Sequence, residues 1–175
     1  MKNKQGEALV IRHWKRMTGL LLVAGMLAIS SGRAYAAGST AKVALDEAIE
    51  TAQNWRPDAI LTNVSSVSVG TDGKAPTWFY GFYSPKSRSF LNVTAKGRSL
   101  DTLELGTGQK EAVPTDFLDT DKVMEEAVQA GLKGDSPRMG LTRTAWIVSG
   151  GQKTGDSTLF LNPKTGRLIK RQAVQ

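Results

Sequence analysis

The chain has 175 residues, no cysteine and one histidine, His13, with a net charge of +7. With no cysteine, and no histidine after residue 13, Ser-His-Asp and Cys-His nucleophilic arrangements are excluded because the usual general base is missing. Ordinary zinc and copper sites and covalent haem attachment are excluded because they need histidine or cysteine side chains. The composition leaves carboxylate, lysine or tyrosine chemistry, and a fold that depends on a hydrophobic core rather than on disulfides.

Residues 1–36 have the three-part layout of a secretory signal. A basic leader precedes an apolar run, 17–29, and the small-residue triplet Ala34-Tyr35-Ala36 follows. This layout predicts cleavage before Ala37. An uncleaved membrane anchor is the alternative, but about 13 apolar residues are fewer than the roughly 20 that span a bilayer as a helix. No cysteine follows the run to carry a lipid.

Removal of the leader changes the charge of the chain. The leader holds six of the 23 basic and one of the 16 acidic residues, so the remainder has 17 basic and 15 acidic residues and a net charge of +2. This small surplus does not indicate a polyanionic partner, and nucleic-acid binding is not expected. The remaining 139 residues suit one ordinary domain, or two small units that share a core.

The first half of the exported chain predicts one helix followed by strands. In the stretch 43–55 the apolar residues follow the spacing of one helical face, and Pro57 ends the helix because it disfavours helical geometry at the residue before it. Four stretches rich in β-branched or apolar residues then predict strands: 60–69, 77–83, 89–95 and 99–105. Residues 106–118 show no apolar period and predict a linker.

The second half repeats this order. Residues 119–132 predict a helix that Asp119 or Asp121 caps, and residues 140–150 predict a strand. Residues 157–171 predict two strands around the turn Asn162-Pro163-Lys164-Thr165-Gly166, since proline presets a turn-compatible angle and glycine accepts a positive φ. Asn63 and Asn92 match the glycosylation pattern and are interpreted as strand residues.

Spacings between the halves indicate an internal repeat. Trp78 and Trp146 are 68 residues apart, and Phe90 and Phe160 are 70 apart. We therefore predict an α+β fold of two helix-plus-antiparallel-sheet units. The predicted boundaries are a signal peptide, a first unit, a linker and a second unit, at 1–36, 37–105, 106–118 and 119–175. Chance similarity of short β-hairpins is the alternative explanation.

The closing stretch "LFLNPKTGRLIKR", 159–171, resembles the end of the PepSY domain, in which two strands flank an Asp- or Asn-led turn containing Lys-Thr-Gly. Residues 119–171 match best, and 43–105 look like a degenerate copy. The resemblance implies a helix packed on an antiparallel sheet and a role in binding or restraining other proteins, often proteases. It brings no catalytic residues. A tandem of such units also resembles β-lactamase inhibitor proteins, in shape only.

The aromatic stretch Trp78-Phe79-Tyr80-Gly81-Phe82-Tyr83 is the main candidate binding site. Strand alternation places Trp78, Tyr80 and Phe82 on one face and Phe79 and Tyr83 on the other. Exposed aromatic residues of this kind form protein interfaces, and Trp146 is predicted to join them. The alternative is a central strand that is buried on both faces.

Two charged groups have simpler interpretations than ligand binding. The acidic group lacks the glycine and the distal glutamate of a calcium loop, so helix capping and solvation explain it and no metal site is predicted. Its members are Asp116, Asp119, Asp121, Glu125 and Glu126. The basic group is interpreted as solubilising an edge strand. Its members are Lys164, Arg167, Lys170 and Arg171.

Together these features predict an exported, non-enzymatic binding module, periplasmic or secreted, that binds or inhibits another protein through the face of its antiparallel sheet. The expected partner is another envelope or extracellular protein, with a protease among the partners that the resemblance implies. The alternative is a small-ligand-binding or sensor protein with an aromatic-lined pocket. No cofactor, no nucleic acid and no membrane span after cleavage are expected.

Overall fold

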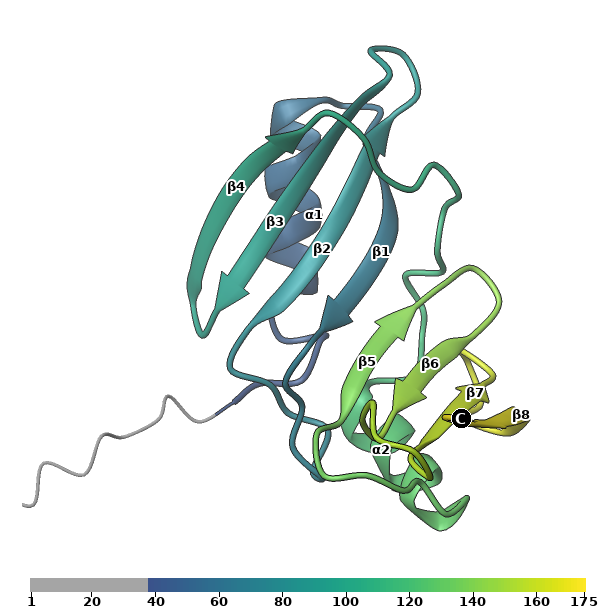
Figure 1. Ribbon diagram of the computed structural model, residues 1–175. Helices are drawn as coiled ribbons and strands as arrows, with labels where there is room; N and C mark the ends of the chain where they lie inside the picture. Colours follow the sequence, from purple (N-terminus) through teal and green to yellow (C-terminus); the bar gives the residue numbers. More distant parts are fainter. Residues whose placement is uncertain (1–37) are drawn as a thin grey trace, which may run out of the picture. The chain divides into compact units, whose positions relative to one another are not determined.

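The computed structural model describes residues 38–175, so the predicted signal peptide lies outside the described residues (Figure 1). The elements in chain order are α1 (Leu45–Trp55), β1 (Ile60–Ser66), β2 (Trp78–Ser84), β3 (Ser89–Lys96), β4 (Ser99–Leu105), α2 (Thr120–Gln129), β5 (Arg138–Leu141), β6 (Trp146–Ser149), β7 (Ser157–Leu161) and β8 (Leu168–Ala173). Within this part of the chain no helix has the length and apolar character needed to cross a membrane.

The eight strands form one antiparallel sheet in the order β4-β3-β2-β1-β5-β6-β7-β8. The two halves of the sheet join where β1 pairs with β5, through Val64↔Leu141, Ser65↔Gly140 and Ser66↔Met139. The predicted fold of two helix-plus-sheet units is therefore wrong, because the chain is mostly β and has a single continuous sheet. Pairing of β1 with β5 satisfies backbone groups that two separate sheets would leave on open edges.

Element boundaries agree with the sequence except in the second half. The predicted strand 140–150 is two strands, β5 and β6, joined by a turn in which the backbone amide of Thr142 donates to the carbonyl of Ala145 at 2.9 Å. The Thr142 hydroxyl also donates to that carbonyl at 2.9 Å. No glycine or proline marks this turn, so its sequence carries no strong turn signal.

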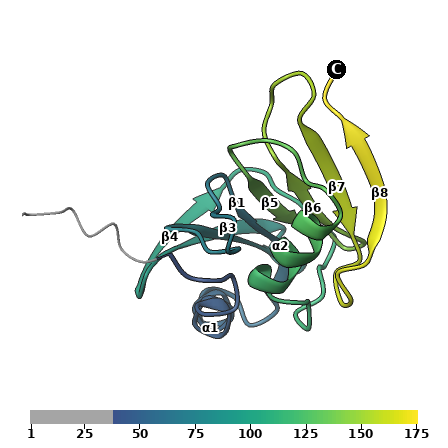
Figure 2. The same ribbon diagram turned by 90° about the horizontal axis from the view of Figure 1, so that it is seen from below.

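One face of the sheet is covered by both helices and forms the core. A row of directly paired residues crosses this face, and all its inner members are fully buried: Val93, Tyr80, Val64, Leu141, Trp146 and Leu161. Helix α1 packs on β2 and β3, and α2 on β6 and β7. Figure 2 shows α1 below the first four strands. We call this face the helix face.

Asp119 is the N-cap of α2 and also connects residues 40–42 to this helix. Its Oδ1 accepts from the amides of Thr120, at 2.8 Å, and Lys42, at 3.2 Å. Its Oδ2 accepts from the Thr40 hydroxyl at 2.7 Å. The predicted choice between Asp119 and Asp121 is thereby resolved in favour of Asp119, because only this carboxylate serves donors from two separate segments.

Replacing Asp119 by alanine is expected to lower the free energy of unfolding by about 1–2 kcal/mol, since it removes a helix cap and two further hydrogen bonds. Urea unfolding followed by circular dichroism measures the change. Asp121→Ala is the matched control, because the Asp121 carboxylate accepts only from the next amide, at 2.8 Å. Equal losses for the two variants would contradict this assignment of the cap.

The segment 106–119 contains no helix or strand and passes from one face of the sheet to the other. It first crosses in front of β3 and β2 (Figure 1). The amide of Val113 then donates to the carbonyl of Leu61 at 2.9 Å, on the part of β1 that the shorter β5 leaves free. Phe117 finally packs edge-on against Trp146 in the core, with ring centroids 5.4 Å apart.

Candidate binding face

The four aromatic residues predicted as a binding surface are core residues. Trp78, Tyr80 and Trp146 are 0% exposed and Phe82 is 2% exposed. Backbone carbonyls of the covering segments accept from their polar atoms: Trp78 Nε1 donates to Ser39 at 2.8 Å, Tyr80 OH to Ala41 at 2.6 Å and Trp146 Nε1 to Leu118 at 3.2 Å. These side chains lie on the helix face, so an exposed interface at these four positions is corrected to a satisfied core.

The opposite face carries no covering helix, and we call it the open face. One row of directly paired residues crosses it from edge to edge over all eight strands. Its members, from β4 to β8, are Asp101, Thr94, Phe79, Ser65, Gly140, Ile147, Phe160 and Lys170. Phe79, Ile147 and Phe160 are only half-buried. The other face of the aromatic strand, with Phe79 and Tyr83, is therefore the one that reaches solvent.

The open-face row has a gap at its centre. Ser65 and Gly140 are its two smallest members and lie between Phe79 and Ile147. A Cβ placed on Gly140 would have no other atom within 4 Å. Neighbouring strands are about 4.8 Å apart, so the gap is two strands wide and suits one or two side chains of a partner. We call Ser65 and Gly140 the central gap.

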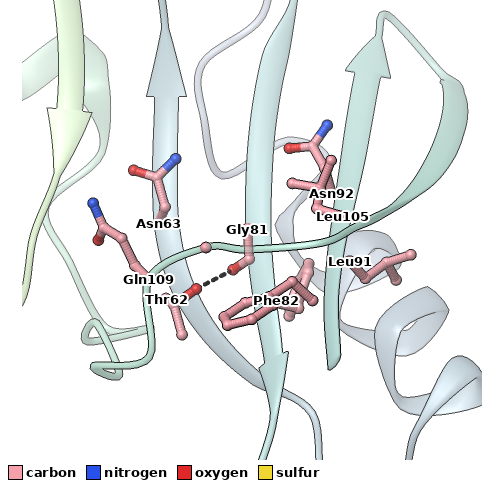
Figure 3. A pocket seen from close by; sticks show the side chains of 10 residues that line it. Thr62, Asn63, Gly81, Phe82, Leu91, Asn92, Leu105 and Gln109 are labelled. Carbon is pink, nitrogen blue, oxygen red and sulfur yellow. Dashed lines mark hydrogen bonds between the residues drawn. The ribbon is translucent and has the colours of Figure 1, made fainter. Parts of the chain in front are cut away.

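A cavity of about 220 Å³ lies elsewhere on the open face, beneath residues 106–119, which we call the crossing segment. Its lining, most of which Figure 3 labels, is Thr62, Asn63, Gly81, Phe82, Phe90, Leu91, Asn92, Leu105, Gly108 and Gln109. A β-bulge between Leu61 and Asn63 inserts Thr62, whose hydroxyl donates to the Gly81 carbonyl at 3.1 Å. Phe82 is the one residue predicted as a binding residue that borders this cavity.

The two Asn-x-Ser/Thr motifs flank this cavity as strand residues, and that interpretation is confirmed. Asn63 and Asn92 are the cross-strand neighbours of Gly81. The Asn63 amide donates to the Ser65 hydroxyl at 3.0 Å, and the Asn92 amide to the Thr94 hydroxyl at 2.9 Å. Residues i and i+2 of a strand share a face, so the motif provides a hydrogen bond along each strand.

Charges are distributed unequally between the two faces. The open face has three cations that form no ion pair among residues 38–175. Lys110 lies over the Tyr83 ring at 5.9 Å and Lys170 over the Phe160 ring at 5.8 Å, and Arg138 is exposed on β5. The helices are acidic: α1 has three carboxylates and no base, and α2 has three carboxylates and one base.

The predicted acidic group is dispersed into structural roles. Asp119 caps α2, and Asp116 forms an ion pair with Lys164 at 2.7 Å, whose hydrogen bond lowers the pKa of the Asp116 carboxyl. Within residues 38–175 no three carboxylate or histidine side chains group closely enough to hold a metal ion. The rest of the basic group lies on or beside β8, an edge strand with every residue exposed. The predicted location of the basic group at an edge strand is therefore confirmed.

Comparisons with known proteins support the fold alone. No protein-family model matches the chain, so the resemblance to the PepSY domain stays a prediction. No curated protein matches it either. Among solved structures, that of a "putative lipoprotein" from Clostridium difficile 630 is similar, with a TM-score of 0.51 and 12% sequence identity. The similarity covers 73% of this chain and 91% of that one.

Proposed function

We propose that this protein is an exported, non-enzymatic binding module of the cell envelope that holds a partner protein against the open face of its sheet. The signal-like layout of residues 1–36 supports export. The similarity in fold to a protein described as a lipoprotein is consistent with a place at the envelope. More specifically, we propose that the protein is released into the periplasm or the medium after cleavage of residues 1–36.

The single observation that carries the proposal is the open-face row. A sheet face that contacts only water usually presents polar side chains, whereas Phe79, Ile147 and Phe160 are half-buried there beside the central gap. Apolar side chains gathered on an uncovered face are typical of protein interfaces. On the helix face, in contrast, the aromatic residues already have protein partners on every side.

A negative charge in the central gap is the direct test. Gly140→Asp is expected to fold normally, because a Cβ there meets no atom within 4 Å and the φ of Gly140 is ordinary. It is expected to reduce capture of the envelope partner about tenfold, because the partner must cover an unpaired carboxylate. The measurement is quantitative affinity capture from envelope extract with the full chain, purified after export.

Gly106→Asp is the matched control, since Gly106 lies beyond β4, outside the open-face row, and a Cβ there also has no atom within 4 Å. Thermal unfolding establishes that both variants are folded. A partner captured equally by the wild type, Gly140→Asp and Gly106→Asp would show that binding does not use the open face.

The alternative function, small-ligand binding in an aromatic-lined pocket, has less support. The cavity beneath the crossing segment holds about 220 Å³, less than the roughly 300 Å³ at the lower end of typical ligand pockets. Its only aromatic side chains are Phe82 and Phe90, and Phe82 is 2% exposed. The amides of Asn63 and Asn92 are already engaged along their strands.

A further inference from the structure

We propose that the partner segment seated on the open face is an acidic polypeptide with aromatic or aliphatic side chains at its centre. This inference rests on the proposed function and specifies the chemistry of the partner. The open face combines an apolar middle, formed by Phe79, Ile147 and Phe160, with unpaired cations around it. A segment that fits must therefore place apolar groups in the middle and carboxylates towards the ends.

The positions of the cations fix this pattern. Lys170 ends the open-face row next to Phe160, and Arg138 lies on β5 two residues from Gly140 on the same face. Lys110 lies over Tyr83 at the opposite end of the strands. Asp101, the anion of the open-face row, is already paired with Lys96 at 3.6 Å. The uncompensated charge of the open face is thus positive.

Charge complementarity favours a carboxylate-bearing chain over a neutral or basic one. Interfaces bring opposite potentials together, and like charges facing each other disfavour the wrong partner. Each helix carries three acidic residues, which on α1 are Asp46, Glu47 and Glu50. A negatively charged partner is therefore attracted to the open face and repelled from the side that carries the helices.

Two other occupants fit less well. A second copy packed face to face would place the same three cations against themselves, since a two-fold interface pairs each patch with its own copy. An anionic membrane would gain only the weak attraction of three separate cations. Its lipids would gain little from the central gap, which is the size of one or two side chains.

Selection from a phage-displayed library of random 12-residue peptides tests the chemistry. Peptides are selected on the wild type and counter-selected on Gly140→Asp. The expected consensus is acidic, with aromatic or aliphatic residues at its centre. The affinity of a consensus peptide for the double variant Arg138→Glu/Lys170→Glu is expected to be about tenfold lower than for the wild type. Lys133→Glu, an exposed charge reversal after α2, is expected to leave the affinity unchanged.

The outcomes separate this inference from the proposed function. A neutral or basic consensus, no enrichment over Gly140→Asp, or full binding to the double charge reversal would overturn the acidic partner. Sedimentation of the protein with vesicles of phosphatidylglycerol and phosphatidylcholine would overturn it in favour of a membrane. Concentration-dependent dimerisation that the double charge reversal abolishes would overturn it in favour of a second copy. If Gly140→Asp no longer binds the envelope partner while the double charge reversal still binds it, the proposed function is retained and the inference of an acidic partner is rejected.

Discussion

Replacing Trp146 by alanine is expected to lower the free energy of unfolding by about 3–5 kcal/mol, a large part of the stability of a domain of this size. The indole is 0% exposed and packs edge-on against Phe117 at 5.4 Å. Its loss leaves a cavity in the core. It also removes the hydrogen bond to the Leu118 carbonyl, which holds the end of the crossing segment on the helix face.

Urea unfolding followed by far-UV circular dichroism measures this loss. Trp55→Ala is the matched control, because Trp55 is half-buried and its indole donates to the exposed Glu104 carboxylate at 2.8 Å. Its expected loss is about 1–2 kcal/mol, in line with partial burial. Should Trp146→Ala fail to fold, Trp146→Phe gives a measurable intermediate loss. Similar losses at positions 146 and 55 would contradict the place of Trp146 in the core.

Tyr80 is expected to make the protein sensitive to alkaline pH. Burial, followed by the charge of Asp119, raises the pKa of the Tyr80 phenol far above its usual value. The folded state therefore keeps this proton at a pH where the unfolded chain loses it. The resulting stability is complete below pH 10 and falls above it by up to about 1.4 kcal/mol per pH unit, until the raised pKa is reached.

Tyr80→Phe isolates this contribution. At pH 8 the variant is expected to be about 1–2 kcal/mol less stable, because the buried Ala41 carbonyl loses a donor at 2.6 Å. Above pH 10 the gap to the wild type is expected to narrow, since phenylalanine has no proton to lose. Free energies of unfolding from urea titrations at pH 8, 9, 10 and 11 measure both effects. A gap that stays constant over this range would contradict the buried phenol.

The final hairpin shows how much local sequence specifies. The turn at Asn162–Gly166 forms as predicted: Gly166 has a φ of +71°, and the Asn162 side chain accepts from the amides of Lys164 and Thr165 at 3.0 Å. Proline and glycine act through backbone angles that belong to single residues, so their effect can be read without the rest of the fold. The position of α2 is predictable for the same local reason, whereas the choice of Asp119 over Asp121 as its cap came from the tertiary structure.

The candidate site shows where such reasoning ends. Alternation correctly divides the aromatic strand into Trp78, Tyr80 and Phe82 on one face and Phe79 and Tyr83 on the other, but both sets are apolar. Only a pattern with one polar face tells which side is buried. Gly140, Ile147 and Phe160 carry no local signal of their own, since they join Phe79 through the register of strands distant in sequence.

By itself, the sequence determined the positions of both helices, most of the strands, the final turn and the lack of cysteine, and of histidine after residue 13. The tertiary structure decided that the strands form one sheet and that the face carrying Tyr80 and Trp146 is the core. The physical reason is that turns and helical faces depend on neighbours in the chain. The choice of buried face depends on where β1 meets β5 and on which side the helices pack.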